Sequence, residues 1–170
     1  MGEAMSGVYL ANLLATAKTP VRTTESRFIN WQTLSTENLI IFGYSENNPW
    51  IDPLLAQYPF HVLPTEGGRL RCIVNTRPAA GEPTEFQMHI STNPDDPTRD
   101  YALVSMLSGV DAVHQLLLIN GLDSECTREA SAYLTDPASV EKLLSRLRLA
   151  SPRHSGPWRF QMVLDTEIRD

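Results

Sequence analysis

The spacing of apolar residues divides this chain into segments of two kinds. Near-continuous apolar runs occupy 38–42 and 116–120, and such runs are typical of parallel strands that are buried on both faces. Both strands are therefore predicted to lie in the interior of one sheet, parallel and close to each other. Apolar residues recur at helical spacing in four other segments, which predict helices over 3–16, from Asn48-Pro49 to Tyr58, after Asp123 or Ser124, and over 137–149.

The middle of the chain has strand patterns joined by turn-forming residues. The segments 70–76, 84–91 and 101–107 are rich in strand-forming residues, and Pro, Gly, Asn and Asp separate them. Short connections of this kind favour antiparallel neighbours, so an antiparallel meander is predicted here. Further strands are predicted at 60–63 and 158–168.

Together these elements predict a single α/β domain over residues 1–170. The expected architecture is a three-layer, Rossmann-like mixed sheet with central parallel strands and an antiparallel meander. A doubly wound unit normally begins with a strand, whereas this chain begins with a helix. Either the fold lacks its first strand or the chain is a fragment of a longer protein, and an unpaired edge beside 38–42 would then favour a homo-oligomer.

Charge, hydropathy and cysteine content exclude several classes of function. The formal net charge of -6 argues against direct nucleic-acid binding, which needs a basic surface. No apolar run approaches the ~20 residues that a membrane span requires, and the start has no signal-peptide pattern, so a soluble, cytoplasmic protein is expected. Cys72 and Cys126 lack close metal-ligand spacing and are predicted to be free, partly buried thiols, with no metal site.

Two loops that directly follow the apolar strands form the candidate ligand site, because open α/β sheets bind ligands beyond the carboxyl ends of their strands. The nine candidate residues are Ser45, Glu46, Asn47, Asn48 and Trp50 in the first loop, and Asp123, Ser124, Glu125 and Thr127 in the second. Hydroxyl and amide groups beside helix N-termini can contact a ligand's polar atoms. The acidic neighbours disfavour a bare polyanion and suit a hydroxyl-rich or cationic ligand, or a metal-bound nucleotide.

A purely structural interpretation of the same loops stays open. In that interpretation the Asn and Asp side chains cap helices, and Trp50 packs on the core. The chain has no G-x-G-x-x-G motif, no P-loop and no complete nucleophile elbow at Ser45. The sequence therefore points to no particular cofactor and to no catalytic residue.

Three short segments carry a resemblance to a known family. They are Gly2-Glu3-Ala4 at a helix start, Asn38 to Gly43 followed by Asn48-Pro49, and Gly121 to Ser124 followed by Thr127 and Ala130. From Gly2 to about Leu164 the chain resembles an uncharacterised α/β domain found C-terminal to winged-helix regulator domains, mainly in acidobacterial proteins. The resemblance implies this architecture and a sensory context, and it implies no reaction. In that family a strand precedes the Gly-Glu-Ala helix, and the first loop often has Gly-Ser-Pro where this chain has Gly43-Tyr44-Ser45.

These observations support three hypotheses about function. The first is a non-enzymatic ligand-sensing or interaction domain of a regulatory protein that binds a small molecule. The second is a nucleotide- or nucleoside-processing enzyme that uses the carboxylates of Glu46, Asp123 and Glu125. The third is a structural dimerisation module.

Overall fold

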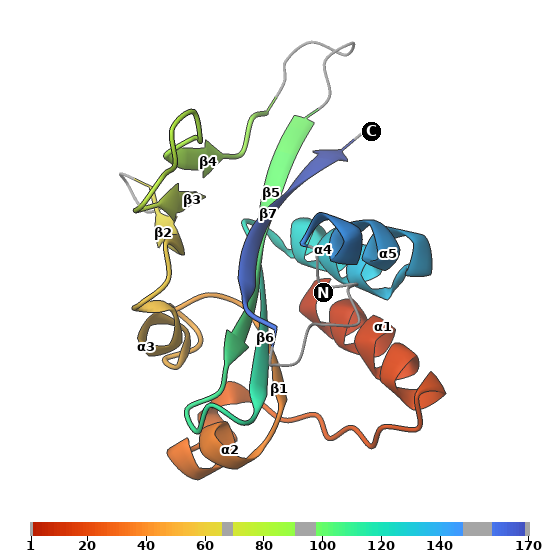
Figure 1. Cartoon of the computed structure of the whole chain (residues 1–170). Helices are drawn as coiled ribbons and strands as arrows, with labels where there is room; N and C mark the ends of the chain where they lie inside the picture. The colour runs from red at the N-terminus through yellow and green to blue at the C-terminus, as the bar shows by residue number, and fades with distance from the viewer. Residues whose placement is uncertain (1, 66–69, 91–97, 148–157, 169–170) are drawn as a thin grey trace.

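The structure is a computed structural model that describes residues 2–65, 70–90, 98–147 and 158–168 (Figure 1). Its elements, in chain order, are α1 (Gly2–Thr16), η1 (Ser26–Phe28), α2 (Trp31–Thr36), β1 (Leu39–Phe42), α3 (Ile51–Leu55), β2 (Phe60–Pro64), β3 (Arg71–Asn75), β4 (Glu85–Gln87), β5 (Thr98–Ser108), β6 (Gln115–Gly121), α4 (Ser124–Thr135), α5 (Pro137–Arg146) and β7 (Phe160–Ile168). The chain is thus a mixed α/β protein, as predicted. None of the described helices is both long enough and apolar enough to cross a bilayer.

The strands form two sheets. A four-stranded mixed sheet has the order β1-β6-β5-β7, and a three-stranded sheet has the order β2-β3-β4. In the larger sheet β1 runs parallel to β6, whereas β5 is antiparallel to both β6 and β7. The predicted parallel neighbours are therefore paired directly, with Leu39 opposite Leu116 and Phe42 opposite Ile119.

Separate apolar clusters bury the two faces of the larger sheet. On one face Ala102, Val104 and Ile119 pack with residues of α1 and α4. On the other face Leu107, Leu116 and Leu118 pack with residues of α2 and α3, and Leu103 packs with the small sheet. Figure 1 shows this division, with α1, α4 and α5 on one side of the sheet and α3 and β2–β4 on the other.

The interior position predicted for 38–42 is wrong, because β1 is an edge strand of the larger sheet. Its side chains alternate between the two clusters, with Leu39 and Ile41 on one face and Ile40 and Phe42 on the other. Helices thus cover both faces of β1, although no described strand pairs with its outer edge. A continuous apolar run reports burial of the faces, and it does not report pairing at the edges. The prediction holds for β6, which lies between β1 and β5.

The predicted meander is divided between the two sheets. β3 pairs with β2 and β4 in the small sheet, while β5 joins the larger sheet. Alternation of polar and apolar residues defines a strand but does not choose its partner, which explains the error. The central parallel strands predicted from the sequence are accordingly a single parallel pair at one side of a mostly antiparallel sheet.

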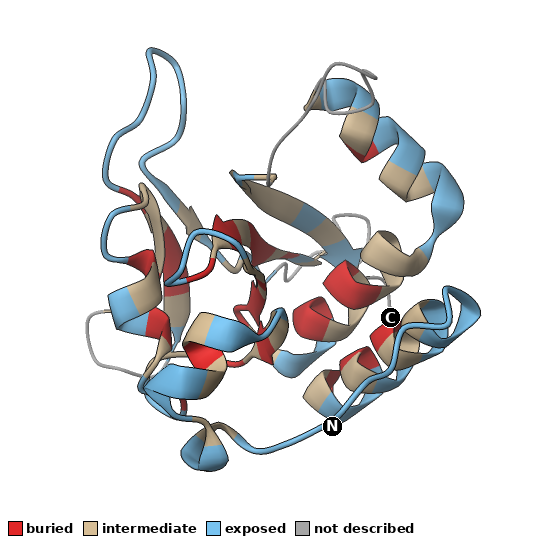
Figure 2. Cartoon of the chain, turned by 60° about the horizontal axis from the view of Figure 1, so that its bottom comes forward, coloured by how far each residue is buried: buried red, intermediate tan, exposed pale blue. Residues whose placement is uncertain are grey.

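The four predicted helices are present, with differences in length and in one buried face, and α2 is a further helix in a segment where the sequence predicts none. α3 has five residues and ends before Pro59, which disfavours helical backbone at the residue before it. The helical spacing over 137–149 predicts that α5 docks through Val140, Leu143, Leu144 and Leu147, but only Leu143 is buried and the other three are half-buried. Figure 2 shows the difference between α4, whose inner side is buried, and the largely exposed α5. The end predicted for this helix, 148–149, lies outside the described residues.

Candidate functional site

The two predicted loops leave the larger sheet side by side. The side-chain amide of Asn120, near the end of β6, donates a hydrogen bond to the carbonyl of Gly43, just beyond β1. Leu122 and Tyr44 pack in the same apolar cluster. The parallel pairing of β1 and β6 produces this proximity, because their carboxyl ends face the same way.

The first loop is a compact turn that its own asparagines hold. Asn47 Oδ1 accepts a hydrogen bond from the N–H of Tyr44 at 3.1 Å, and Asn48 Oδ1 accepts one from the N–H of Trp50 at 3.2 Å. Gly43 has a φ of 100°, a conformation that favours glycine, and a Cβ there would lie 2.9 Å from Asn47 Oδ1. The amide oxygens of Asn47 and Asn48 are therefore engaged inside the loop.

Trp50 and Ser45 have different surroundings. Trp50 packs against the core cluster and meets Trp31 edge-to-face at 5.2 Å between ring centroids, as the structural interpretation expects. Ser45 is half-buried. Its hydroxyl forms no hydrogen bond with the residues that the structure describes, so this group remains available to a ligand.

Glu46 belongs to a cation–carboxylate arrangement that the sequence did not suggest. The Arg71 guanidinium, from β3, lies 3.7 Å from the centroid of the Tyr44 ring, and Arg71 Nε lies 3.3 Å from Glu46 Oε1. Arg71 is thus held over an aromatic face and beside a carboxylate, two groups that attract cations. Arg71 comes from the small sheet, so only the tertiary fold brings it to the first loop.

The charges of carboxylates from three chain segments act on the Tyr44 phenol. Burial raises the pKa of the Tyr44 phenol, Arg71 opposes this effect, and the charges of Glu3, Asp123 and Glu46 raise the pKa further. Glu3 belongs to α1, whose start packs closely on α4: a Cβ at Gly2 would lie 1.7 Å from the Ser124 carbonyl oxygen. The N-terminus of α1 is therefore a third component of this region.

The second loop divides into structural and outward-facing residues. Asp123 caps α4, with Oδ1 accepting from the N–H of Cys126 at 2.8 Å. Thr127 is buried, and its hydroxyl donates to the Asp123 carbonyl at 2.9 Å and accepts from the N–H of Gly121. Glu125 pairs with Arg128 along the exposed side of α4, and this pairing lowers the pKa of Glu125.

Of the nine candidates, Ser45 and Glu46 follow Tyr44 directly in the chain, and the charges of Glu46 and Asp123 act on the Tyr44 phenol. Asn47, Asn48, Trp50 and Thr127 have structural contacts, the carbonyl of Ser124 faces α1, and Glu125 faces Arg128. Sequence reasoning missed Glu3, Tyr44, Arg71 and Asn120. Asn120 could have been identified from the sequence, because it ends an apolar run that predicts a buried strand. A polar side chain buried there, as Asn120 is, needs a hydrogen-bond partner.

Asn120 retains one unsatisfied atom at the junction of the loops. Its Oδ1 is buried and accepts no hydrogen bond from the described residues. One group of possible metal ligands also lies here among the described residues, comprising Asp100, Asp123 and Cys126. Asp123 therefore belongs both to the loop site and to this cluster.

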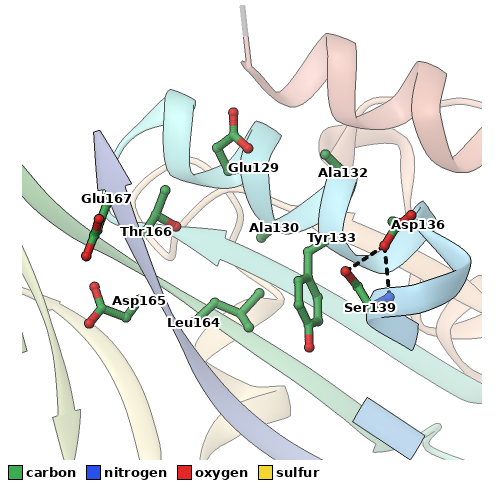
Figure 3. A pocket seen from close by; sticks show the side chains of 10 residues that line it. All are labelled: Glu129, Ala130, Ala132, Tyr133, Asp136, Ser139, Leu164, Asp165, Thr166 and Glu167. Carbon is green, nitrogen blue, oxygen red and sulfur yellow. Dashed lines mark hydrogen bonds between the residues drawn. The ribbon is translucent and has the colours of Figure 1, made fainter. Parts of the chain in front are cut away.

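A separate open groove of about 470 Å³ lies between α4, α5 and β7 (Figure 3). Its lining includes four acidic residues: Glu129, Asp136, Asp165 and Glu167. Asp136 caps α5 by accepting from Ser139, and Arg99 pairs with Asp165 and Glu167. The groove contains none of the nine candidate residues, and its acidic groups already have structural partners.

No protein-family model matches this chain, and neither the curated proteins nor the solved structures include a match.

Proposed function

We propose that this chain is a non-enzymatic ligand-binding domain with a regulatory role. Its small-molecule ligand binds at the carboxyl ends of β1 and β6, beside Tyr44, Glu46 and Asp123. The proposal includes a Rossmann-like architecture, because open α/β sheets of that kind bind ligands at the carboxyl ends of their strands. The regulatory context rests on the resemblance to domains that follow winged helices.

The observation that carries the proposal is the position of Arg71 over Tyr44 and beside Glu46. This region binds one cationic group already, and the charges of Glu3 and Asp123 reach the same phenol. A ligand with an ammonium group can take the place of the guanidinium over the ring. Its hydroxyl groups can then bond to Ser45 and to the Asp123 carboxylate.

The position of the histidines favours binding over hydrolysis. The Asp111–His114 pair, with 2.6 Å between His114 Nδ1 and Asp111 Oδ2, precedes β6 and lies at the opposite end of that strand from the two loops. The described part of the chain places no histidine in hydrogen-bond contact with Ser45. The nucleotide- or nucleoside-processing alternative would use the carboxylates of Glu46, Asp123 and Glu125, but Glu46 pairs with Arg71, Asp123 caps α4 and Glu125 pairs with Arg128.

Thermal unfolding with a panel of primary amines, quaternary ammonium compounds and polyols tests the proposal. A ligand at one hundred times its dissociation constant should add about 2.7 kcal/mol to the free energy of unfolding. The stabilisation should disappear in Tyr44→Leu and Glu46→Gln. It should weaken in Asp123→Asn, which removes the charge and keeps a capping side chain.

Glu125→Gln is the matched control, because it removes a nearby carboxylate that faces Arg128 instead of Tyr44. Equal loss of ligand stabilisation in Glu125→Gln and Glu46→Gln would contradict the proposed site. So would a panel in which the only stabilising compounds are polyanions.

One observation favours the dimerisation module as a second candidate. β1 is an edge strand with no described partner on its outer side. Such an edge can pair with another chain. The module would use this edge and leave the loop site free.

A further inference from the structure

Asp100, Asp123 and Cys126 come together from three parts of the chain. Asp100 lies in β5, Asp123 precedes α4, and Cys126 lies in the first turn of α4. Their carboxylate oxygens and the sulfur all lie within 4.8 Å of one another. Asp100 and Cys126 are fully buried, and Asp123 is half-buried.

The Asp100 carboxyl is an incompletely satisfied polar group in the interior. Its Oδ1 accepts from the N–H of Tyr101 at 2.7 Å, while its buried Oδ2 accepts no hydrogen bond from the described residues. Burial raises the pKa of Asp100 to about 6, and the Tyr101 N–H and the Cys126 thiol oppose this shift. The nearby Asp123 raises it further, so the groups of the described chain that shift this pKa include a second acid and no cation.

Burial of an acid and a thiol beside a second acid is unfavourable when no described residue supplies a positive charge to them. A buried carboxylate is normally paired, hydrogen-bonded or bound to a metal. Arg99, the neighbour of Asp100 on β5, does not supply the charge, because its guanidinium pairs with Asp165 and Glu167. Burial and the negative charges of Asp100 and Asp123 raise the pKa of the Cys126 thiol, so a bound cation is what would stabilise the thiolate that metals require.

We propose that Asp100, Asp123 and Cys126 are the protein ligands of a divalent transition-metal ion of the zinc type. A thiolate ligand favours Zn²⁺ or Co²⁺ over Mg²⁺ and Ca²⁺, which prefer oxygen ligands alone. Three protein ligands leave at least one coordination position for water or for a further donor.

The geometry requires only small side-chain movements. Tetrahedral zinc with Zn–S of about 2.3 Å and Zn–O of about 2.1 Å places its ligand atoms roughly 3.4–3.6 Å apart. The three atoms here are separated by at most 4.8 Å, so rotations that move them inward by about an ångström suffice. On binding, a metal–sulfur bond forms as the Cys126 S–H proton passes to solvent, together with any proton on Asp100.

This inference does not depend on the proposed small-molecule ligand. The two sites share Asp123, but Asp100 and Cys126 lie on the α4 side of β5, and Arg71 and Glu46 meet beside the small sheet. The tests therefore use Asp100 and Cys126, which take no part in the cation–π arrangement at Tyr44.

Titration of the full, reduced and metal-free chain with Co²⁺ tests the inference directly. Bound Co²⁺ should produce a thiolate-to-cobalt charge-transfer absorption that saturates at one ion per chain, and Zn²⁺ should displace it. Cys126→Ser should abolish the absorption. Asp100→Asn keeps the Cys126 sulfur ligand but removes one carboxylate ligand. The affinity for Co²⁺ should therefore fall by at least the roughly 10–100-fold that is typical when a residue hydrogen-bonded to a metal ligand is lost.

Cys72→Ser is the matched control, because Cys72 is the other buried free cysteine and lies in β3 of the small sheet. It should leave the absorption unchanged. The inference is overturned if the unmodified chain shows no such absorption, if Cys72→Ser removes it, or if Cys126→Ser retains it. Should Cys126→Ser fail to fold, as judged by circular dichroism, the affinity of folded Asp100→Asn decides, and an unchanged value refutes the site.

Discussion

The different burial of two leucines that are paired in the larger sheet makes a quantitative prediction. Leu39 on β1 and Leu116 on β6 are partners in the parallel register and pack in the same cluster. Leu116 is fully buried, whereas Leu39 is only partly buried. We expect Leu116→Ala to destabilise the protein considerably more than Leu39→Ala.

The magnitudes follow from the burial of each side chain. Leucine to alanine removes three carbon groups, and each is worth about 0.8 kcal/mol of transfer free energy, or about 2.4 kcal/mol in all. The cavity left at a fully buried site raises the cost of Leu116→Ala into the range of about 2–5 kcal/mol. Leu39 already contacts solvent and leaves no closed cavity, so its cost should be about 1 kcal/mol.

Urea denaturation of the two variants and the unmodified chain measures the difference. The m-values should agree, so that a change in midpoint reports stability alone. A loss of about 3 kcal/mol corresponds to a melting temperature lower by roughly 6–12 °C for a chain of this size. Equal losses in the two variants would refute the partial exposure of Leu39, because they would mean that Leu39 is as completely enclosed as Leu116.

Three further predictions concern α5, the turn before β6 and the open edge. Leu143→Ala should cost more than Leu144→Ala, by at least about 1 kcal/mol in chemical denaturation, because only Leu143 is buried; the reverse order would show that α5 is rotated. Hydrogen bonds from the His114 and Val113 N–H groups and the His114 ring lower the pKa of Asp111 to about 2, so its stabilising contribution should persist above pH 4 and disappear as the pH falls toward 2. Carboxyl NMR titration checks this value, and Asp111→Asn should remove that part of the pH dependence of stability. Self-association through β1 should appear as concentration-dependent sedimentation, whereas a monomer at high concentration would contradict it.

The predicted ligand site shows where sequence reasoning succeeds and where it stops. The loops after 38–42 and 116–120 do lie together, because parallel neighbours end on the same side of a sheet. The roles of Asp123 and Asp136 as helix caps were also visible, since a cap depends on residues within one turn. The partners of Tyr44 were not visible, because Arg71 comes from another sheet and Glu3 from the first helix.

The sequence by itself determined the local elements: helical spacing, apolar runs, proline positions and capping residues predict most strands and helices of the described chain. Tertiary structure alone decided that β1 lies at an edge, that β3 and β5 belong to different sheets, and that Asp100 meets Cys126. The physical reason is the range of the interactions. Periodicity and caps act over a few residues, whereas strand order depends on contacts between distant segments, and several pairings bury the same apolar faces equally well.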